Sequence, residues 1–232
     1  AYLMAFTIPN LIYVILGGAL ATAFIPVFTS INVKEGPGEA SRLASYTMNL
    51  AALVMTVITI LGILLAPLLV ALIAPGFSPE ARLLTVKLTR IMFPCVFLAT
   101  LSMLQGGILN SLQHFAAPAF TSAAFSGTVI LSVFFLVPEM GVYGLALGTV
   151  LAMVAQILIQ VPAMFGRGLR YIPKISLEDP GVKKIGELVF PVMIGTSVNQ
   201  IYVTIDRILA STLSEGSLAA LNFANKLMFL PF

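Results

Sequence analysis

Ionic residues are absent from long parts of this chain, and this absence constrains the fold more than any other feature. No Asp, Glu, Lys or Arg occurs within residues 1–33, 43–79, 91–138 or 140–166. A helix needs about 20 mostly apolar residues to cross a hydrocarbon core of about 30 Å. Each run therefore holds at least one membrane-spanning helix, and the chain is predicted to be an all-α, polytopic membrane protein.

The overall composition agrees with this class. Charged residues make up 9% and hydrophobic residues 59% of the chain, whereas a soluble domain carries about 25% charged residues. Disorder is excluded, because disordered chains combine low hydrophobicity with high net charge. The few cations are better interpreted as marks of membrane topology than as a nucleic-acid-binding patch, so no nucleic-acid partner is expected. The single cysteine, Cys95, cannot form an intramolecular disulfide.

The runs predict seven helical segments. The run 91–138 is too long for one crossing and is interrupted by the polar stretch 110–118, which includes a proline. The predicted segments are 1–30, 42–74, 81–110, 118–137, 141–165, 187–213 and 216–232. The chain begins and ends inside apolar runs, so we expect it to be part of a longer polytopic protein.

The connections between these segments predict an orientation. Connections one, three and five carry seven Lys or Arg residues, whereas the opposite side carries three. Under the positive-inside rule, the odd-numbered connections are cytoplasmic. The longest of them, residues 166–186, mixes cations with proline, glycine and apolar residues. An interfacial linker on the anionic inner leaflet is expected, with a specific lipid-headgroup site as the alternative.

Charged residues that the spans cannot avoid are the leading candidates for function, because a charge at the centre of a spanning helix is costly. Asp206 and Arg207 lie in the sixth segment. Helical spacing puts Gln200 and Arg207 on one polar stripe, with Asp206 on its flank. This stripe suits the wall of a hydrated cavity, and an interhelical polar pair that fixes packing is the alternative.

Lys226 is the most deeply placed cation. If its helix begins near Gly216, Lys226 lies about 15 Å into the membrane, and Asn225 neighbours it. A lone cation at this depth indicates an anionic substrate group or a carboxylate partner, whereas a purely structural role is the alternative.

The first segment contains helix breakers. Pro9, Gly17, Gly18 and Pro26 interrupt an otherwise apolar helix. Transporters place broken helices at their moving parts, so these four residues are hinge candidates, and a static proline kink is the alternative. No phosphate-binding loop, zinc-ligand spacing or nucleophile motif occurs, so we expect a transporter without a cofactor or metal and not an enzyme.

Specific strings point to a family. The stretch 5–12, with Pro9 and Asn10, and the stretch 17–28 closely resemble the second helix of the MurJ (MviN) family of lipid II flippases. Residues 72–77 resemble its outer loop, residues 105–120 its connection from helix four to helix five, and residues 221–231 its eighth-helix motif. Together these strings span the whole chain.

The resemblance implies a fold and a function. The fold is that of the multidrug/oligosaccharidyl-lipid/polysaccharide exporters, the MATE-like MOP superfamily, with two lobes about a central cavity. Residues 1–165 would be helices two to six of the first lobe, 166–186 the cytoplasmic linker, and 187–232 the opening helices of the second lobe. The implied function is to flip undecaprenyl-diphosphate-linked lipid II across the bacterial cytoplasmic membrane by alternating access, for cell wall synthesis.

The resemblance also assigns residues. Lys226 stands where the family has a cavity Arg, and Tyr13 stands where many members have an Arg three residues after the Pro-Asn pair. The candidate substrate-binding residues are Lys226, Asn225, Asn10, Gln200 and Arg207. Phospholipids are expected as surrounding partners. Two alternatives stay open: export of another polyprenyl-linked glycan, and cation-coupled multidrug efflux, in which Asp206 would bind a monovalent coupling cation.

Overall fold

The charge-free runs fold into long helices. The computed structural model describes residues 1–211 and residue 224. In chain order, the elements are α1 (Tyr2–Ile12), η1 (Tyr13–Gly17), α2 (Gly18–Lys34), α3 (Pro37–Ile73), α4 (Pro79–Met92), α5 (Pro94–Ser111), α6 (Ala116–Phe135), α7 (Val137–Met140), α8 (Val142–Gly166) and α9 (Pro180–Ser211).

Six stretches of helix are long and apolar enough to cross a membrane: Tyr2–Lys34, Pro79–Ser111, the helices α3, α6 and α8, and Pro180–Leu209 of α9. They confirm the first six predicted segments. The seventh, 216–232, lies outside the described residues except for residue 224, and Asn225 and Lys226 also lie outside them. The all-α membrane class is therefore confirmed.

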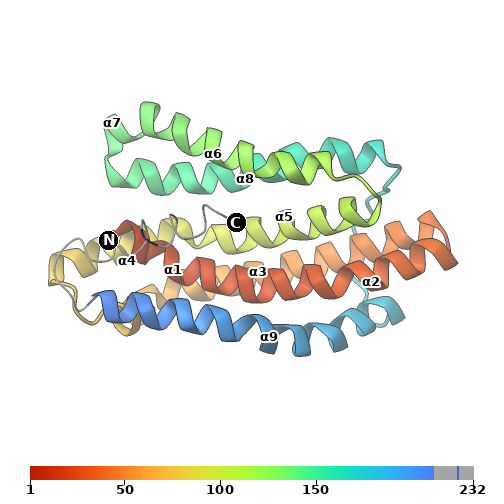
Figure 1. The fold of residues 1–232 in the computed structure, drawn as a ribbon, viewed down its shortest axis with the longest axis horizontal. Helices are drawn as coiled ribbons and strands as arrows, with labels where there is room; N and C mark the ends of the chain where they lie inside the picture. Colours follow the sequence, from red (N-terminus) through yellow and green to blue (C-terminus); the bar gives the residue numbers. More distant parts are fainter. Residues whose placement is uncertain (212–223, 225–232) are drawn as a thin grey trace.

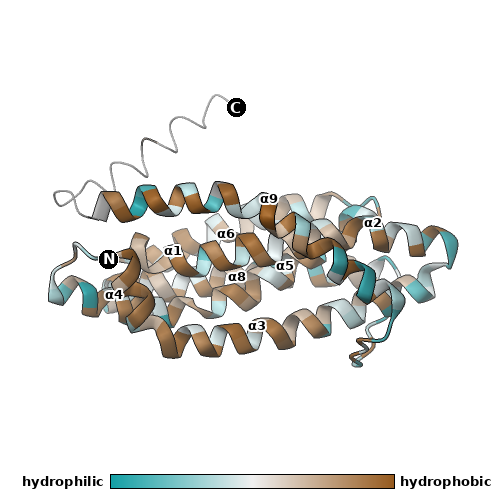
Figure 2. Ribbon diagram, turned by 90° about the horizontal axis from the view of Figure 1, so that it is seen from below, coloured by the Kyte–Doolittle hydropathy of each residue, from teal (hydrophilic) through white to brown (hydrophobic). Residues whose placement is uncertain are grey.

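The helices lie side by side along one long axis (Figure 1). α6 packs against α8, α8 against α5, and α5 against α2 and α3, whereas α9 lies on the opposite side of the molecule against α2 and α3. Brown, apolar residues dominate the helices, and teal, polar residues gather near their ends (Figure 2). This distribution is the one expected of a bundle that stands in lipid.

Connections one, three and five meet at one end of the bundle. The Arg167 side chain contacts His114 Nδ1 at 3.0 Å, which joins connections five and three. Arg42, just after connection one, pairs with Asp179 of connection five at 3.6 Å. All three connections therefore lie on one side, as the charge distribution predicts, and we refer to this side as the linker end.

The linker is shorter than the sequence predicts, because α9 begins at Pro180 and not at residue 187. The Asp179 carboxylate accepts hydrogen bonds from the backbone N–H groups of Gly181 and Val182 at 2.9 and 3.3 Å. An acidic residue followed by proline is a favourable start for a helix, since the side chain satisfies N–H groups that have no partner in the first turn. Lys183 and Lys184, which the sequence analysis assigns to the linker, therefore lie in the first turns of α9.

The linker is held on α3. The Asn49 Nδ2 group donates to the carbonyl oxygens of Ile172 and Lys174, both at 2.9 Å. The Tyr171 hydroxyl donates to Asn49 Oδ1 at 2.6 Å, and Ser45 Oγ accepts from the Ile172 N–H at 3.0 Å. Residues 170–174 therefore have no helix of their own but obtain hydrogen bonds from α3.

In two spanning helices, carbonyl groups that a proline leaves without a helical partner accept hydrogen bonds from a neighbouring helix. A proline at position i leaves the carbonyl of residue i−4 without its helical partner. Pro9 frees the Ala5 carbonyl, which accepts from Thr89 Oγ1 of α4 at 3.4 Å. Pro67 frees the Ile63 carbonyl, which accepts from Arg90 Nε at 3.3 Å. Neighbouring helices thus satisfy backbone groups that lipid could not.

Candidate functional site

The polar stripe of α9 meets the first helix at Arg207. Its Nη1 atom donates a hydrogen bond to Thr7 Oγ1 of α1 at 2.8 Å. Thr7 is only 3% exposed, and Arg207 is half-buried. The guanidinium carries five N–H donors and no acceptor, so one contact with Thr7 leaves further donors available. Arg207 is therefore held at the α1–α9 contact with its charge uncompensated by a carboxylate among the described residues.

Asn10 lies one turn further along the same helix and is oriented by Tyr13. The Tyr13 hydroxyl donates to Asn10 Oδ1 at 2.7 Å. Because that oxygen accepts, the amide N–H groups of Asn10 remain as free donors. Tyr13 is also close enough to Arg207 for an electrostatic interaction. The region formed by Thr7, Asn10, Tyr13 and Arg207, which we call the α1–α9 polar site, thus presents hydrogen-bond donors and one positive charge.

Pro9 precedes a change in helix type that affects Tyr13. After α1, residues Tyr13–Gly17 form a π-helical turn, and the helix resumes as α2 at Gly18. Such π-turns inside α-helices occur frequently at functional sites. The backbone remains helical through Pro9 and Pro26. The first span therefore changes its hydrogen-bonding pattern at Tyr13–Gly17 but is not broken.

The two glycines of the hinge hypothesis differ in their surroundings. A Cβ atom built on Gly17 would lie 2.8 Å from Thr100 Oγ1 and 3.2 Å from the Thr100 Cα atom, whereas one on Gly18 would meet nothing within 4 Å. Gly17 therefore permits close approach of η1 and α5. A packing role accounts for Gly17, and the hinge role of Gly17, Gly18, Pro9 and Pro26 stays a prediction.

Asp206 does not pair with its neighbour Arg207 within the described part of the chain. Its half-buried carboxylate makes no ion pair there, while Arg207 turns to Thr7. Gln200 is half-buried, and its backbone carbonyl accepts from Thr204 Oγ1 at 2.8 Å. Over residues 1–211, the structure brings Arg207 and Asn10 to one region. Asn225 and Lys226 lie outside it.

A second polar group lies between α5 and α8, and the charge pattern of the sequence does not predict it. Gln160 Nε2 donates to Ser102 Oγ at 2.9 Å and to the Ser102 and Gln156 carbonyls at 3.2 Å. Gln156 and Tyr13 also line one cavity of about 330 Å³ between α1, η1, α5, α6 and α8. The signal in the sequence is the spacing of Gln156 and Gln160, one helical turn apart in an apolar segment, which marks a polar face of α8 without identifying its partner.

Within residues 1–211, no cluster of three or more His, Cys, Asp or Glu side chains is arranged to hold a metal ion. The donors of the α1–α9 polar site instead suit an anion. Arg207 and the Asn10 amide can each offer N–H groups to an oxyanion, and charge-assisted hydrogen bonds of this kind are the strong ones.

Comparison with known proteins identifies the family. The family model described as "Lipid II flippase MurJ" matches residues 1–232. The lipid II flippase MurJ of Burkholderia cenocepacia is 30% identical over 100% of this chain and 46% of its own length. The probable lipid II flippase MurJ of Vibrio cholerae is 32% identical over 92% of this chain and 43% of its own length. The chain thus spans about half the length of these curated relatives.

Two solved structures show the fold. A lipid II flippase MurJ in an inward closed conformation superposes with a TM-score of 0.79 at 24% identity, over 99% of this chain and 48% of that one. An inward-facing multidrug resistance MATE transporter of the MOP superfamily superposes with a TM-score of 0.72 at 21% identity, over 90% of this chain and 47% of that one. With a family model that matches every residue and relatives that align over 92 to 100% of this chain, the chain belongs to the lipid II flippase MurJ family.

Proposed function

We propose that this chain is part of a flippase that moves lipid-linked peptidoglycan precursor across the bacterial cytoplasmic membrane by alternating access. Family membership supports this function, and so does the MATE-like arrangement of the helices. In this proposal, residues 1–165 belong to the first lobe, the region 166–186 joins the lobes, and α9 begins the second lobe.

The observation that carries the proposal is the contact of Arg207 with Thr7. It places a cation from the proposed second lobe beside the Asn10 amide of the first. The diphosphate of a polyprenyl-linked glycan is an anion with many acceptor oxygens, and a fixed array of N–H donors between two lobes would bind it. Arg207 and Asn10 are therefore our substrate-binding candidates within the described residues, with Gln200 further along the stripe and Lys226 and Asn225 beyond it.

A depletion experiment tests this function. The full-length protein is depleted in cells, and lipid II at the outer leaflet is measured with a membrane-impermeant enzyme that cleaves it. We expect lipid II to accumulate on the inner side, and Arg207→Ala to fail in restoring export. Arg82→Ala, a change of an exposed cation at the other end of the bundle from the linker, is the control. Unchanged export during depletion would exclude the proposal.

Asp206 supports a more specific proposal, that transport is coupled to a monovalent cation. A half-buried carboxylate without an ion pair among the described residues is the kind of group that ion-coupled carriers use, because binding the cation offsets its cost in the membrane. Asp206→Asn should make export insensitive to a sodium or proton gradient in reconstituted vesicles. Retained gradient dependence in this variant would remove Asp206 from the coupling mechanism.

A further inference from the structure

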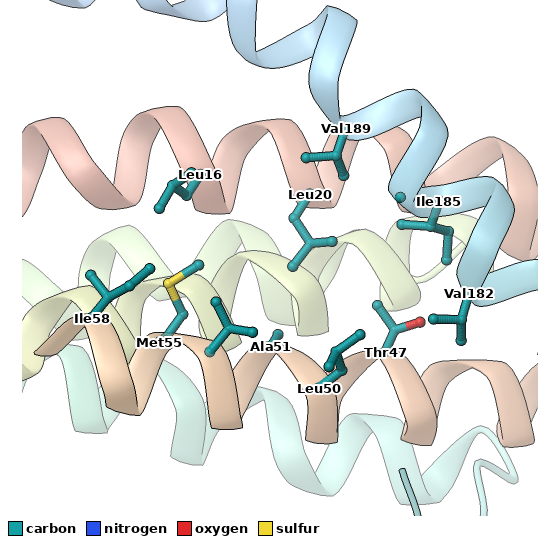
Figure 3. Close-up of a pocket in the computed structure, with 12 residues that line it drawn as sticks. Leu16, Leu20, Thr47, Leu50, Ala51, Met55, Ile58, Val182, Ile185 and Val189 are labelled. Carbon is teal, nitrogen blue, oxygen red and sulfur yellow. The ribbon is translucent and has the colours of Figure 1, made fainter. Parts of the chain in front are cut away.

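A cavity lies between α2, α3 and the start of α9, away from the α1–α9 polar site (Figure 3). Its volume is about 270 Å³. Apolar side chains point into it from three sides: Leu16 and Leu20, Ala51 and Met55, and Ile185 and Val189. This interior suits a hydrocarbon chain.

The cavity opens sideways. Val54 and Gly186 line it and are themselves exposed. Toward the linker end, Gly181 packs against Leu43 and Ile31 so closely that a Cβ atom there would lie 2.7 and 3.0 Å from their methyl groups. That contact packs the start of α9 tightly on α2 and α3. The exposed lining residues Val54 and Gly186 instead give an occupant access between α3 and α9, where a spanning helix faces lipid.

One polar side chain forms part of the wall of this apolar space. Thr47 lines the cavity, is 3% exposed, and its Oγ1 atom has no hydrogen-bond partner among the described residues. Thr56 in the same helix, like Thr100 in α5, bonds to the carbonyl four residues earlier. An unpaired buried hydroxyl costs free energy, and this one lies near Val182 of α9 (Figure 3). A ligand with a hydrogen-bonding group at this depth would satisfy it.

A free cation stands beside the opening. Lys183 follows the lining residue Val182, is exposed, and makes no ion pair within residues 1–211. Its neighbour Lys184 is paired with Glu187 at 3.1 Å. Lys183 and Gly186, spaced at i and i+3, share a face of α9. Positive charge therefore lies one turn from the opening, on the side toward the linker end.

We propose that this cavity binds one acyl chain of an anionic phospholipid from the leaflet at the linker end. The chain lies against Leu16 and Met55, an ester oxygen meets the Thr47 hydroxyl, and the phosphate meets Lys183. The eleven helical steps from Thr47 to Ile58 rise about 17 Å, which matches one leaflet, or half of a hydrocarbon core of about 30 Å. The site does not depend on the identity of the transported substrate.

Photocrosslinking tests the site. The full-length protein is reconstituted in phosphatidylcholine nanodiscs that contain a minor fraction of phosphatidylglycerol with a diazirine on one acyl chain. Crosslinks are then mapped by peptide mass spectrometry. We expect labelling of residues 47–58 and 182–189. Gly186→Leu should abolish the labelling, because Gly186 lines the cavity at its opening and a leucine side chain would fill it. The substitution should not disturb the fold, since a Cβ at Gly186 meets nothing within 4 Å. Gly195→Leu, equally unobstructed and on the same helix, is the matched control.

Two further variants separate the polar contacts. Thr47→Val should lower phosphatidylglycerol affinity about fivefold, the effect of one hydrogen bond of about 1 kcal/mol. Thr59→Val, a buried threonine of α3 that also lacks a partner but does not line this cavity, should not. Lys183→Gln should reduce phosphatidylglycerol labelling to the level of a phosphatidylcholine analogue, and Lys87→Gln, a change of an exposed cation of α4, should leave it unchanged.

Three results would overturn the proposal. One is labelling of residues 47–58 and 182–189 that Gly186→Leu leaves intact. In the second, a polyprenyl diphosphate displaces the label and unlabelled phosphatidylglycerol does not. That result would assign the cavity to the substrate's tail. Loss of labelling in Gly195→Leu as well would show a general change in α9 and would likewise count against a local site.

Discussion

Arg207 and Thr7 are 200 residues apart in sequence and are joined by a hydrogen bond of 2.8 Å. The bond fastens α9 to α1 at the end of the bundle opposite the linker, whereas Gly181 fastens the start of α9 to α2 and α3 at the linker end. If α9 belongs to a second lobe that moves, the Arg207–Thr7 bond must break in the conformation that opens this end. The bond then contributes to the closed state.

Thr7→Val should therefore weaken the closed state while keeping the shape of the side chain. Loss of this charged hydrogen bond is worth about 1.5 to 3 kcal/mol, and it leaves Arg207 without its acceptor. We expect faster labelling of a cysteine introduced at residue 10 by an impermeant maleimide added from the side opposite the linker. Thr22→Val is the control, because Thr22 is exposed and bonds only to its own helix. Equal labelling of all three proteins would argue against a gating role.

Tyr13→Phe tests whether Tyr13 orients Asn10. The change removes the donor at 2.7 Å but retains the ring, which packs near Phe6 with a centroid separation of 6.3 Å. We expect unchanged thermal stability within about 1 kcal/mol and a clear loss of lipid II export, since the Asn10 amide can rotate freely. Tyr202→Phe, on an exposed face of α9, should export normally. Normal export by Tyr13→Phe would limit Tyr13 to packing.

Alanine substitutions at Gly17 and Gly18 distinguish a hinge role of these glycines from a packing role. If packing decides, Gly17→Ala is destabilising, because its Cβ would lie 2.8 Å from Thr100 Oγ1. Gly18→Ala should then be neutral or stabilising by up to about 1 kcal/mol from helix propensity. Thermal unfolding in detergent measures both effects. A hinge instead predicts that Gly18→Ala, although stable, slows export.

Asn49→Ala should release the linker from α3. Asn49 makes two hydrogen bonds to the Ile172 and Lys174 carbonyls and accepts a third from Tyr171. Without them the Ile172 and Lys174 carbonyls lose their partner in α3, and only Ser41 and Ser45, which accept from the Arg170 and Ile172 N–H groups at 3.4 and 3.0 Å, still bind this backbone from α3 among the described residues. Trypsin should therefore cleave faster after Arg170 and Lys174. Asn110→Ala, at an exposed asparagine at the same end, is the matched control. Unchanged cleavage would mean that Ser41 and Ser45 hold the linker alone.

The helices could be predicted from the sequence, because lipid excludes charged residues from the spans. Where nearly every charge lies outside the hydrocarbon region, the gaps between charges are the spans. The start of α9 differs from the prediction: charge assigns Lys183 and Lys184 to the linker, whereas the helix begins at Pro180, because an Asp179–Pro180 pair is a favourable helix start. Charge alone does not distinguish a linker from the first turns of a helix.

Only one of the two residues joined at the candidate site could be predicted from the sequence. Arg207 stood out because a charge in a span requires an explanation. Its partner Thr7 did not, since a threonine in a spanning helix ordinarily bonds to its own backbone and nothing local indicates a contact 200 residues away. The same limit applies to Asn49 and the linker and to Gln160 with Ser102. These pairings follow from tertiary packing and not from local pattern.

Pro67 and Arg90 provide a quantitative test of how the bundle satisfies its backbone. Arg90 Nε donates to the Ile63 carbonyl at 3.3 Å, which has no helical partner because Pro67 lacks an N–H. Arg90→Gln should destabilise the natural chain by about 1 kcal/mol. In a Pro67→Ala background, residue 67 can donate to Ile63 itself, so the same Arg90→Gln change should have a smaller effect.

A double-mutant cycle on the free energy of unfolding in detergent measures this coupling, with an expected interaction energy of about 0.5 to 1.5 kcal/mol. Lys87→Gln in both backgrounds is the control, because Lys87 is an exposed cation of the same helix without a hydrogen bond from its side chain to Ile63. Additive effects of Pro67→Ala and Arg90→Gln would show that the Ile63 carbonyl draws its stability from elsewhere. Arg90 would then act only as an anchor at the membrane interface.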